Sequence, residues 1–258
     1  AALQLAKSYV IENPRSKVLI IGSDIVRYSP ESSGEPTQGG AAVAFVVSQN
    51  PRIWEIEPYS GIHATDVMDF WRPVYLNEAL FDGKLSAYSY LKSIDICIER
   101  YLKNSNLGIS DIHYACFHAP FGKMARKAND QSSLKCQSID DTLVYNSVIG
   151  NSCSASLFIC FISLLDHLNN DLAGRRIGFF SYGSGSVAEF FSGIMSENYQ
   201  QMLNTMNNQT MISNRLEISF HEYELICANR LHDFSRHKNI GDVTLTGTNN
   251  HQRIYCQV

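Results

Sequence analysis

Short apolar segments separated by polar or glycine-rich ones run along the whole chain, a pattern typical of a mixed α/β fold. Continuous apolar runs predict buried strands at 17–22, 41–47, 112–117, 176–181 and 186–191. Apolar residues at helical spacing predict helices at 1–10, 90–103, 122–128 and 151–168. Gly, Ser and Pro predict a loop at 29–40 and a tight turn at 182–185. Residues 53–89 mix aromatic and polar positions, so no element is assigned to them.

The order helix, strand, strand occurs twice, at 1–47 and again at 151–191. The second copy follows the strand at 112–117, whereas no strand precedes the first copy in the sequence given. The first helix also lacks a Ser, Thr, Asp or Asn to cap its first turn. We therefore expect a duplicated α/β fold that begins upstream of Ala1 in a longer protein. A trimmed chain is the alternative.

Composition narrows the class of protein. The 258 residues are 45% hydrophobic and 18% charged, which indicates a globular chain. The formal net charge of −4 argues against sequence-independent nucleic-acid binding, which needs a basic surface. No apolar run reaches the roughly 18 residues of a membrane helix. We expect a cytoplasmic protein that binds neither nucleic acid nor membrane.

The seven cysteines are irregularly spaced and form no Cys-x-x-Cys pair. This usage predicts mostly buried free thiols in a reducing compartment. His113, Cys116 and His118 are close in sequence and raise the alternative of a metal site. On a strand, however, His113 would point away from the other two, so we expect no metal.

Two polar residues stand where apolar elements end. His118 follows a predicted strand and precedes Pro120, and such strand ends often carry active-site groups in α/β folds. A core or surface histidine is the alternative. Asn151 opens the predicted apolar helix, where its amide could face an oxyanion or carbonyl, or simply cap the helix.

Other candidates are a glycine-rich turn, a basic stretch and a carboxylate. The 181–186 segment (SYGSGS) lacks the lysine of a P-loop, but its backbone N–H groups could hold an anionic oxygen; an ordinary hairpin turn is the alternative. The basic stretch could bind a substrate phosphate or form a solvated helix face; it comprises Lys123, Arg126 and Lys127. Asp69, just before an aromatic pair, could line a pocket or cap a helix.

Taken in order, these motifs resemble the 3-hydroxy-3-methylglutaryl (HMG) synthase family of thiolase-like condensing enzymes. The matching segments are 22–28 (GSDIVRY), 34–42 (GEPTQGGAA), 69–73 (DFWRP), 82–86 (DGKLS), 116–124 (CFHAPFGKM), 149–151 (IGN) and 180–186 (FSYGSGS). Segment 132–141 is shorter than the family usually has there.

The resemblance implies one thiolase-like domain over 1–258, with a duplicated five-layer α/β/α/β/α fold. Residues 1–50 would be the rest of its first half, 51–105 a family insertion and 106–258 the second half. It also implies a nucleophilic Cys shortly before the first helix and a catalytic Glu further upstream. None of the seven cysteines present stands at that nucleophile position, so the N-terminal part of the fold is expected to lie outside this sequence.

The family reaction implies a role for each motif residue. The Cys takes an acetyl group, the Glu removes a methyl proton, and the carbanion adds to the β-ketone of an acetoacetyl thioester. His118 would stabilise oxyanion charge, Asn151 would position the acceptor, and Gly183 and Ser184 would complete the hole for the acetyl carbonyl. The implied supporting residues are Asp24, Asp69 and Tyr182. The resemblance also implies contacts to the substrate arm, that is, to the pantetheine or phosphate portion of the thioester. These contacts are Pro120, Lys123, Arg126 and Lys127.

The resemblance implies a homodimer and no metal or redox cofactor, with phosphopantetheine-linked thioesters as substrates. Two substrate types remain open. We favour acyl carrier proteins, as in polyketide β-branching. The C-terminal segment 252–256 resembles that group, and segment 132–141 differs from the enzymes that use coenzyme A esters. Coenzyme A esters of the mevalonate pathway are the alternative. A non-catalytic relative that binds carrier proteins is the alternative of another class.

Overall fold

The computed structural model describes residues 1–76, 79–203, 207–228, 243–249 and 252–257. The chain divides into two compact units, Ala1–Gln209 and Thr210–Val258. The first unit contains helices α1 (Ala2–Glu12), α2 (Gly83–Ser105), α3 (Gly122–Gln131), α4 (Val144–Ile149), α5 (Ser156–His167) and α6 (Tyr199–Leu203). Its strands are β1 (Val18–Ile25), β2 (Gly40–Val47), β3 (Trp54–Ala64), β4 (Phe70–Trp71), β5 (Leu80–Phe81), β6 (Tyr114–Phe117), β7 (Arg176–Gly183) and β8 (Val187–Met195).

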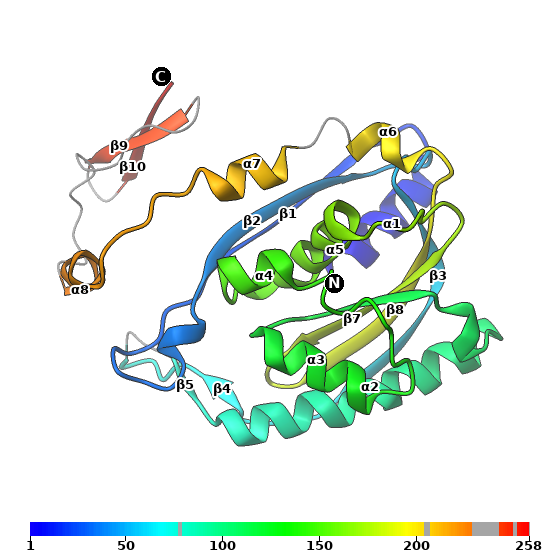
Figure 1. Ribbon diagram of the computed structural model, residues 1–258, viewed down its shortest axis with the longest axis horizontal. Coiled ribbons are helices and arrows are strands. Elements are labelled where there is room, and N and C mark those ends of the chain that lie inside the picture. The colour runs from blue at the N-terminus through cyan, green and yellow to red at the C-terminus, as the bar shows by residue number, and fades with distance from the viewer. Residues whose placement is uncertain (77–78, 204–206, 229–242, 250–251, 258) are drawn as a thin grey trace. The chain divides into compact units, whose positions relative to one another are not determined.

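A four-stranded sheet in the order β3-β8-β7-β6 forms the centre of the first unit. Strands β6 and β7 are parallel, while β7–β8 and β8–β3 are antiparallel. Long helix α2 covers one face and α5 the other (Figure 1). Strand β7 is buried on both faces because Phe179 packs on Phe161 of α5, whereas Phe180 packs on Tyr90 of α2.

A second sheet, formed by β1 and β2, lies across α1 and α5 from the first (Figure 1). Aromatic rings connect the layers: Phe158 of α5 meets Phe45 of β2 at 4.6 Å, and Phe161 meets Trp54 of β3 at 5.6 Å. The element order helix, strand, strand therefore does occur twice, as α1-β1-β2 and α5-β7-β8, with β6 before the second copy.

The outer face of the sheet formed by β1 and β2 is exposed, although both strands were predicted to be buried. Large apolar side chains on this face are exposed: Leu19, Ile21, Ile25 and Val46. The prediction was wrong for this face because no described residue covers it, while α1 and α5 cover the other.

Several element boundaries also differ from the predictions. Residues 53–89, left unassigned, contain strand β3 and the start of α2, which Asp82 caps by accepting from the N–H groups of Lys84 and Leu85. Strand β7 runs through Tyr182 and Gly183, so the tight turn begins only at Ser184.

Three short 3-10 helices, two further α-helices and a hairpin complete the described chain. They are 3-10 helices at Glu35–Thr37, Ile109–Asp111 and Cys153–Ala155, then α7 (Asn208–Ser213), α8 (Phe220–Ala228) and the antiparallel pair β9 (Val243–Asn249) and β10 (Gln252–Gln257). Within the described residues no helix has both the length and the apolar character needed to cross a bilayer. The prediction of a single domain over 1–258 stays a prediction.

An ion pair fastens β3 to the start of β7. Arg176 Nε lies 2.7 Å from Glu57 Oε2, and both side chains are less than one-fifth exposed. Ser192 donates to the same carboxylate, and Tyr101 lies 2.6 Å from the Ser192 hydroxyl. The carboxylate therefore has a charged partner from β7 and a neutral partner from β8, which offset its loss of hydration.

We expect Glu57→Leu to lower the free energy of unfolding by about 3 kcal/mol, because it leaves the Arg176 cation unpaired. The double variant Glu57→Leu/Arg176→Met should recover most of that loss, since neither charge remains. Urea unfolding measures both. Equal losses in the single and double variants would contradict this account of the ion pair.

Candidate active site

His118 is the residue that directly follows β6, and its backbone is fixed on both sides. Its N–H donates to Phe180 O at 2.8 Å, and its C=O accepts from the Tyr90 hydroxyl at 2.7 Å. Within the described residues nothing hydrogen-bonds to its ring nitrogens. Burial lowers the pKa of His118 to about 4, so its half-buried imidazole is neutral at pH 7. A neutral imidazole at a strand end can donate one hydrogen bond to a substrate oxygen.

The next residue is held by a buried serine of α5. Ser156 Oγ accepts from Ala119 N–H at 3.0 Å and donates to Ala119 O at 2.9 Å. Asn146 of α4 donates to Ser156 Oγ at 3.2 Å. All three residues are buried, so this arrangement satisfies both peptide groups of Ala119 away from water. Ser156 and Asn146 were not predicted, although a serine in an otherwise apolar helix is a usable signal.

Asn151 does not open α5, and that part of the prediction was wrong. Helix α5 begins at Ser156, after a 3-10 turn at Cys153–Ala155. Asn151 instead forms a bridge with Gln38, donates its backbone N–H to Thr37 O and accepts from Cys153 N–H at 2.9 Å. Its backbone is thus tied to the loop between β1 and β2, while its side-chain oxygen holds the turn at Cys153.

Close backbone contact explains the glycines beside Asn151. A Cβ added to Gly39 would lie 2.3 Å from Ile149 O, and Gly150 has a φ of 83°. The Tyr28 side chain lies in the same region, with its ring centroid 5.2 Å from that of Phe81. Burial raises the pKa of Tyr28, and a hydrogen bond with Asn151 offsets part of that rise. Tyr28 belonged to a quoted motif but had no predicted role.

Asp69 holds the glycine-rich turn. This fully buried carboxylate accepts from Gly185 N–H at 2.9 Å and from the Tyr182 hydroxyl at 3.3 Å. The Gly185 N–H is therefore already occupied, while Ser184 lies exposed at the tip of the turn. The predicted roles of Gly183 and Ser184 in holding a carbonyl oxygen stay predictions.

The structure gathers these residues into two neighbouring groups. The first contains His118, Tyr90, Tyr182 and Asp69, in which the Tyr90 ring lies 6.5 Å from His118 and 5.1 Å from Tyr182. In the second, around Asn151, Asp24 accepts from Ser154 Oγ at 3.3 Å. Ser156, five residues after Asn151, contacts Ala119 and so connects the two groups. Asp24 and Asp69 thus both support loops of the candidate site.

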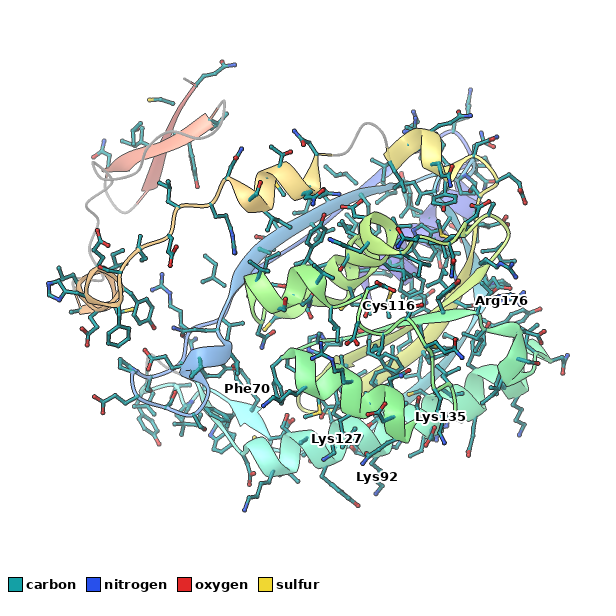
Figure 2. The ribbon with its side chains drawn as sticks, viewed as in Figure 1. Phe70, Lys92, Cys116, Lys127, Lys135 and Arg176 are labelled. Carbon is teal, nitrogen blue, oxygen red and sulfur yellow. The ribbon has the colours of Figure 1, made fainter. Side chains whose placement is uncertain are left out.

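The basic stretch lies on the exposed side of α3, just after half-buried Pro120. Arg126 Nε pairs with Asp140 Oδ1 at 2.6 Å, where both side chains are at least half exposed. Lys123 and Lys127 are exposed and make no ion pair with any described residue. Lys127 is labelled in Figure 2. These two lysines are therefore the more available cations for a substrate arm.

All seven cysteines are free thiols, and four are buried, including Cys116 (Figure 2). This confirms the prediction of mostly buried free thiols. Burial raises the pKa of Cys153, next to the site, to about 11, so it is a poor nucleophile at neutral pH. Within the described residues no group of three or more His, Cys, Asp or Glu side chains could hold a metal ion.

Comparison with known proteins agrees with the motifs. The family model described as hydroxymethylglutaryl-coenzyme A synthase C terminal matches residues 56–134 and 130–248. A hydroxymethylglutaryl-CoA synthase of Enterococcus faecalis is 38% identical over 240 residues, covering 90% of this chain and 63% of that protein. The polyketide biosynthesis 3-hydroxy-3-methylglutaryl-ACP synthase PksG of Bacillus subtilis (strain 168) is 32% identical over 257 residues, covering 88% and 60%.

A solved structure of an HMG-CoA synthase complexed with CoA superposes with a TM-score of 0.90 at 32% identity. The superposition covers 100% of this chain and 70% of the chain in the solved structure. These findings confirm a thiolase-like fold. The chain belongs to the hydroxymethylglutaryl-CoA synthase family. It spans about 60% of the length of the two curated relatives. The two parts of the family match overlap at 130–134, where the segment predicted to be short begins.

We expect Ser156→Ala to lower the free energy of unfolding by about 3 kcal/mol, because both Ala119 peptide groups lose their buried partner. Ser93→Ala is the matched control: Ser93 is also a buried helix serine, but it donates only to Ser89 O within α2. Its loss should stay below about 1 kcal/mol. Urea unfolding compares the two, and equal losses would contradict the role given to Ser156.

We expect Asp69→Ala to cost about 3 kcal/mol of unfolding free energy, since it leaves Gly185 N–H and the Tyr182 hydroxyl without their acceptor. Tyr182→Phe removes only one of these hydrogen bonds and should cost about 1 kcal/mol. Amide hydrogen exchange at Gly185 should accelerate in Asp69→Ala alone. Equal acceleration in both variants would show that Asp69 does not hold the turn.

Proposed function

We propose that the protein to which this chain belongs is an HMG synthase-type condensing enzyme, an acyltransferase that forms a C–C bond. The observation that carries the proposal is His118, a neutral imidazole fixed at the end of β6 within a chain of the HMG-CoA synthase family. An acetyl group bound to an enzyme cysteine loses a methyl proton and adds to the β-ketone of an acceptor thioester. Water then releases the product.

In this reaction His118 donates an N–H hydrogen bond to the acceptor oxygen, where negative charge develops. Its low pKa keeps it neutral at pH 7, so it donates through a single N–H and leaves the acceptor thioester without a neighbouring imidazolium charge. The Asn151 amide nitrogen orients the acceptor, because its oxygen is already used by Cys153 N–H. Gly183 and Ser184 form the backbone hole for the acetyl carbonyl, and Asp69 holds that turn.

The proposed substrates are acetyl and β-ketoacyl thioesters on acyl carrier proteins, as in polyketide β-branching. PksG, whose name specifies an ACP product, supports this choice, whereas the relative from Enterococcus faecalis supports coenzyme A esters as the second candidate. Lys123 and Lys127 suit the acidic groups of either arm. The proposal includes a homodimer and no metal or redox cofactor.

The test uses the whole protein, purified from its natural source, with any segment that precedes Ala1 in it. It is mixed with acetyl carrier protein or with acetyl-CoA, and the intact mass is measured. We expect a gain of one acetyl group from the carrier protein. A gain from acetyl-CoA alone would assign the coenzyme A substrates instead. No gain from either donor would contradict the condensing activity and favour a non-catalytic relative.

The same protein carrying Lys123→Gln and Lys127→Gln tests the substrate arm. We expect KM for the carrier-protein substrate to rise about tenfold with kcat unchanged, because rim charges act on encounter and binding. Lys84→Gln/Lys92→Gln on α2 is the control with the same change of charge. An equal rise in both double variants would show only an effect of net charge.

A further inference from the structure

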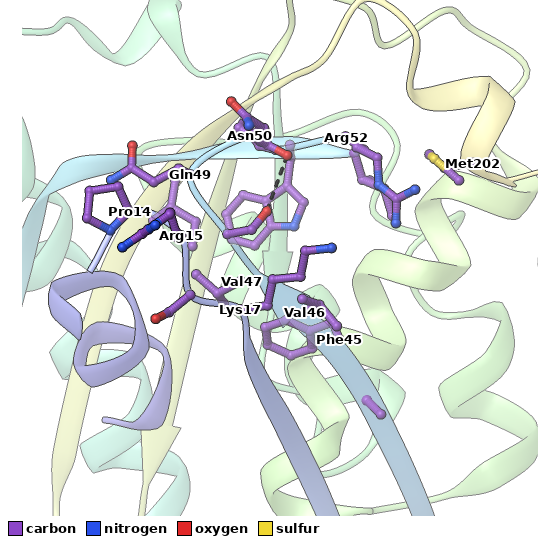
Figure 3. A pocket seen from close by; sticks show the side chains of 17 residues that line it. Pro14, Arg15, Lys17, Phe45, Val46, Val47, Gln49, Asn50, Arg52 and Met202 are labelled. Carbon is purple, nitrogen blue, oxygen red and sulfur yellow. Dashed lines mark hydrogen bonds between the residues drawn. The ribbon is translucent and has the colours of Figure 1, made fainter. Parts of the chain in front are cut away.

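A cavity of about 930 Å³ lies at the opposite end of β1 and β2 from Asn151 (Figure 3). Val18 pairs with Val47 at the cavity end, whereas Ile25 pairs with Gly40 at the end near Asn151. Seven residue steps along a strand amount to about 23 Å. The cavity is therefore separate from the candidate active site.

The inner wall of this cavity is apolar and firmly backed. Phe45 and Trp54 line it. Behind them, Phe45 packs on Phe158 at 4.6 Å and Trp54 packs on Phe179 at 4.8 Å. Core packing thus fixes both rings, and the wall exists before any ligand arrives. A preformed apolar wall is typical of small-molecule sites.

The rim of the cavity is basic. Arg15, Lys17 and Arg52 line it, and none of its 17 lining residues is an Asp or Glu. Neither ion pair found in the described part of the chain involves these three cations. Figure 3 shows Lys17 and Arg52 on the same side of this view of the cavity. Three cations with no carboxylate in the same lining favour an anion over a neutral or cationic ligand.

We propose that this cavity binds a small organic anion with an apolar body, of the class of medium-chain carboxylates. The acid group lies between Lys17 and Arg52, and the hydrocarbon part lies on Trp54 and Phe45. Charge alone is too exposed to give strong binding, and the apolar wall alone does not select an anion. Both parts of the site are needed for selectivity.

Trp54 lines the cavity and serves as a fluorescent reporter once Trp71, the other tryptophan of the given sequence, is replaced. Trp71→Phe therefore serves as the parent protein for titrations followed by Trp54 fluorescence. The probes are octanoate, neutral octanamide of the same length, and acetate, which has the charge without the chain. We expect saturable binding of octanoate at least tenfold tighter than that of either comparison compound.

Lys17→Gln/Arg52→Gln should weaken octanoate binding at least tenfold and leave octanamide unchanged. The matched control, Lys92→Gln/Lys103→Gln on exposed positions of α2, removes the same charge and should bind octanoate like the parent. Unchanged far-UV circular dichroism in each variant verifies its folding. No saturable signal, equal affinity for octanoate and octanamide, or equal weakening in the control pair would overturn the proposal.

Discussion

The chain between Phe117 and Pro120 leaves the four-stranded sheet while its peptide groups are still buried, and those groups must be satisfied. Phe180, Tyr90 and Ser156 supply the partners, each from a different element. As a result the His118 backbone is fixed from the sheet, from α2 and from α5 together. The buried hydrogen bonding therefore fixes the backbone position from which the imidazole projects.

Helix α5 serves both packing and the site. Its aromatic residues Phe158 and Phe161 fill the space between the two sheets. Their packing sets the distance between α5 and β7. At this distance Ser156, in the first turn of α5, can form its two hydrogen bonds with Ala119. A shift of the helix would break the two hydrogen bonds at Ala119, so core packing and site geometry depend on each other.

Motifs in the sequence were sufficient to predict the family, the repeated helix-strand-strand order and the place of His118 after a buried strand. They failed for Asn151 because a 3-10 turn and a bridge to Gln38 replace the expected helix start. Spacing also cannot reveal that Asp69 reaches Gly185, since such long-range hydrogen bonds depend on tertiary contacts. The apolar runs of β1 and β2 indicated strands, but not that one face would be exposed.

The most direct measurement is an NMR titration of the His118 ring in the isotope-labelled chain, with His118→Gln identifying its signal. The account predicts a pKa near 4, because burial disfavours the charged ring and the ring has no acidic partner among the described residues. Ser156→Ala should raise that value toward 6.5, since a loosened strand end admits water. A pKa of 6 or above in the unaltered chain would contradict the neutral, fixed imidazole on which the proposed chemistry rests.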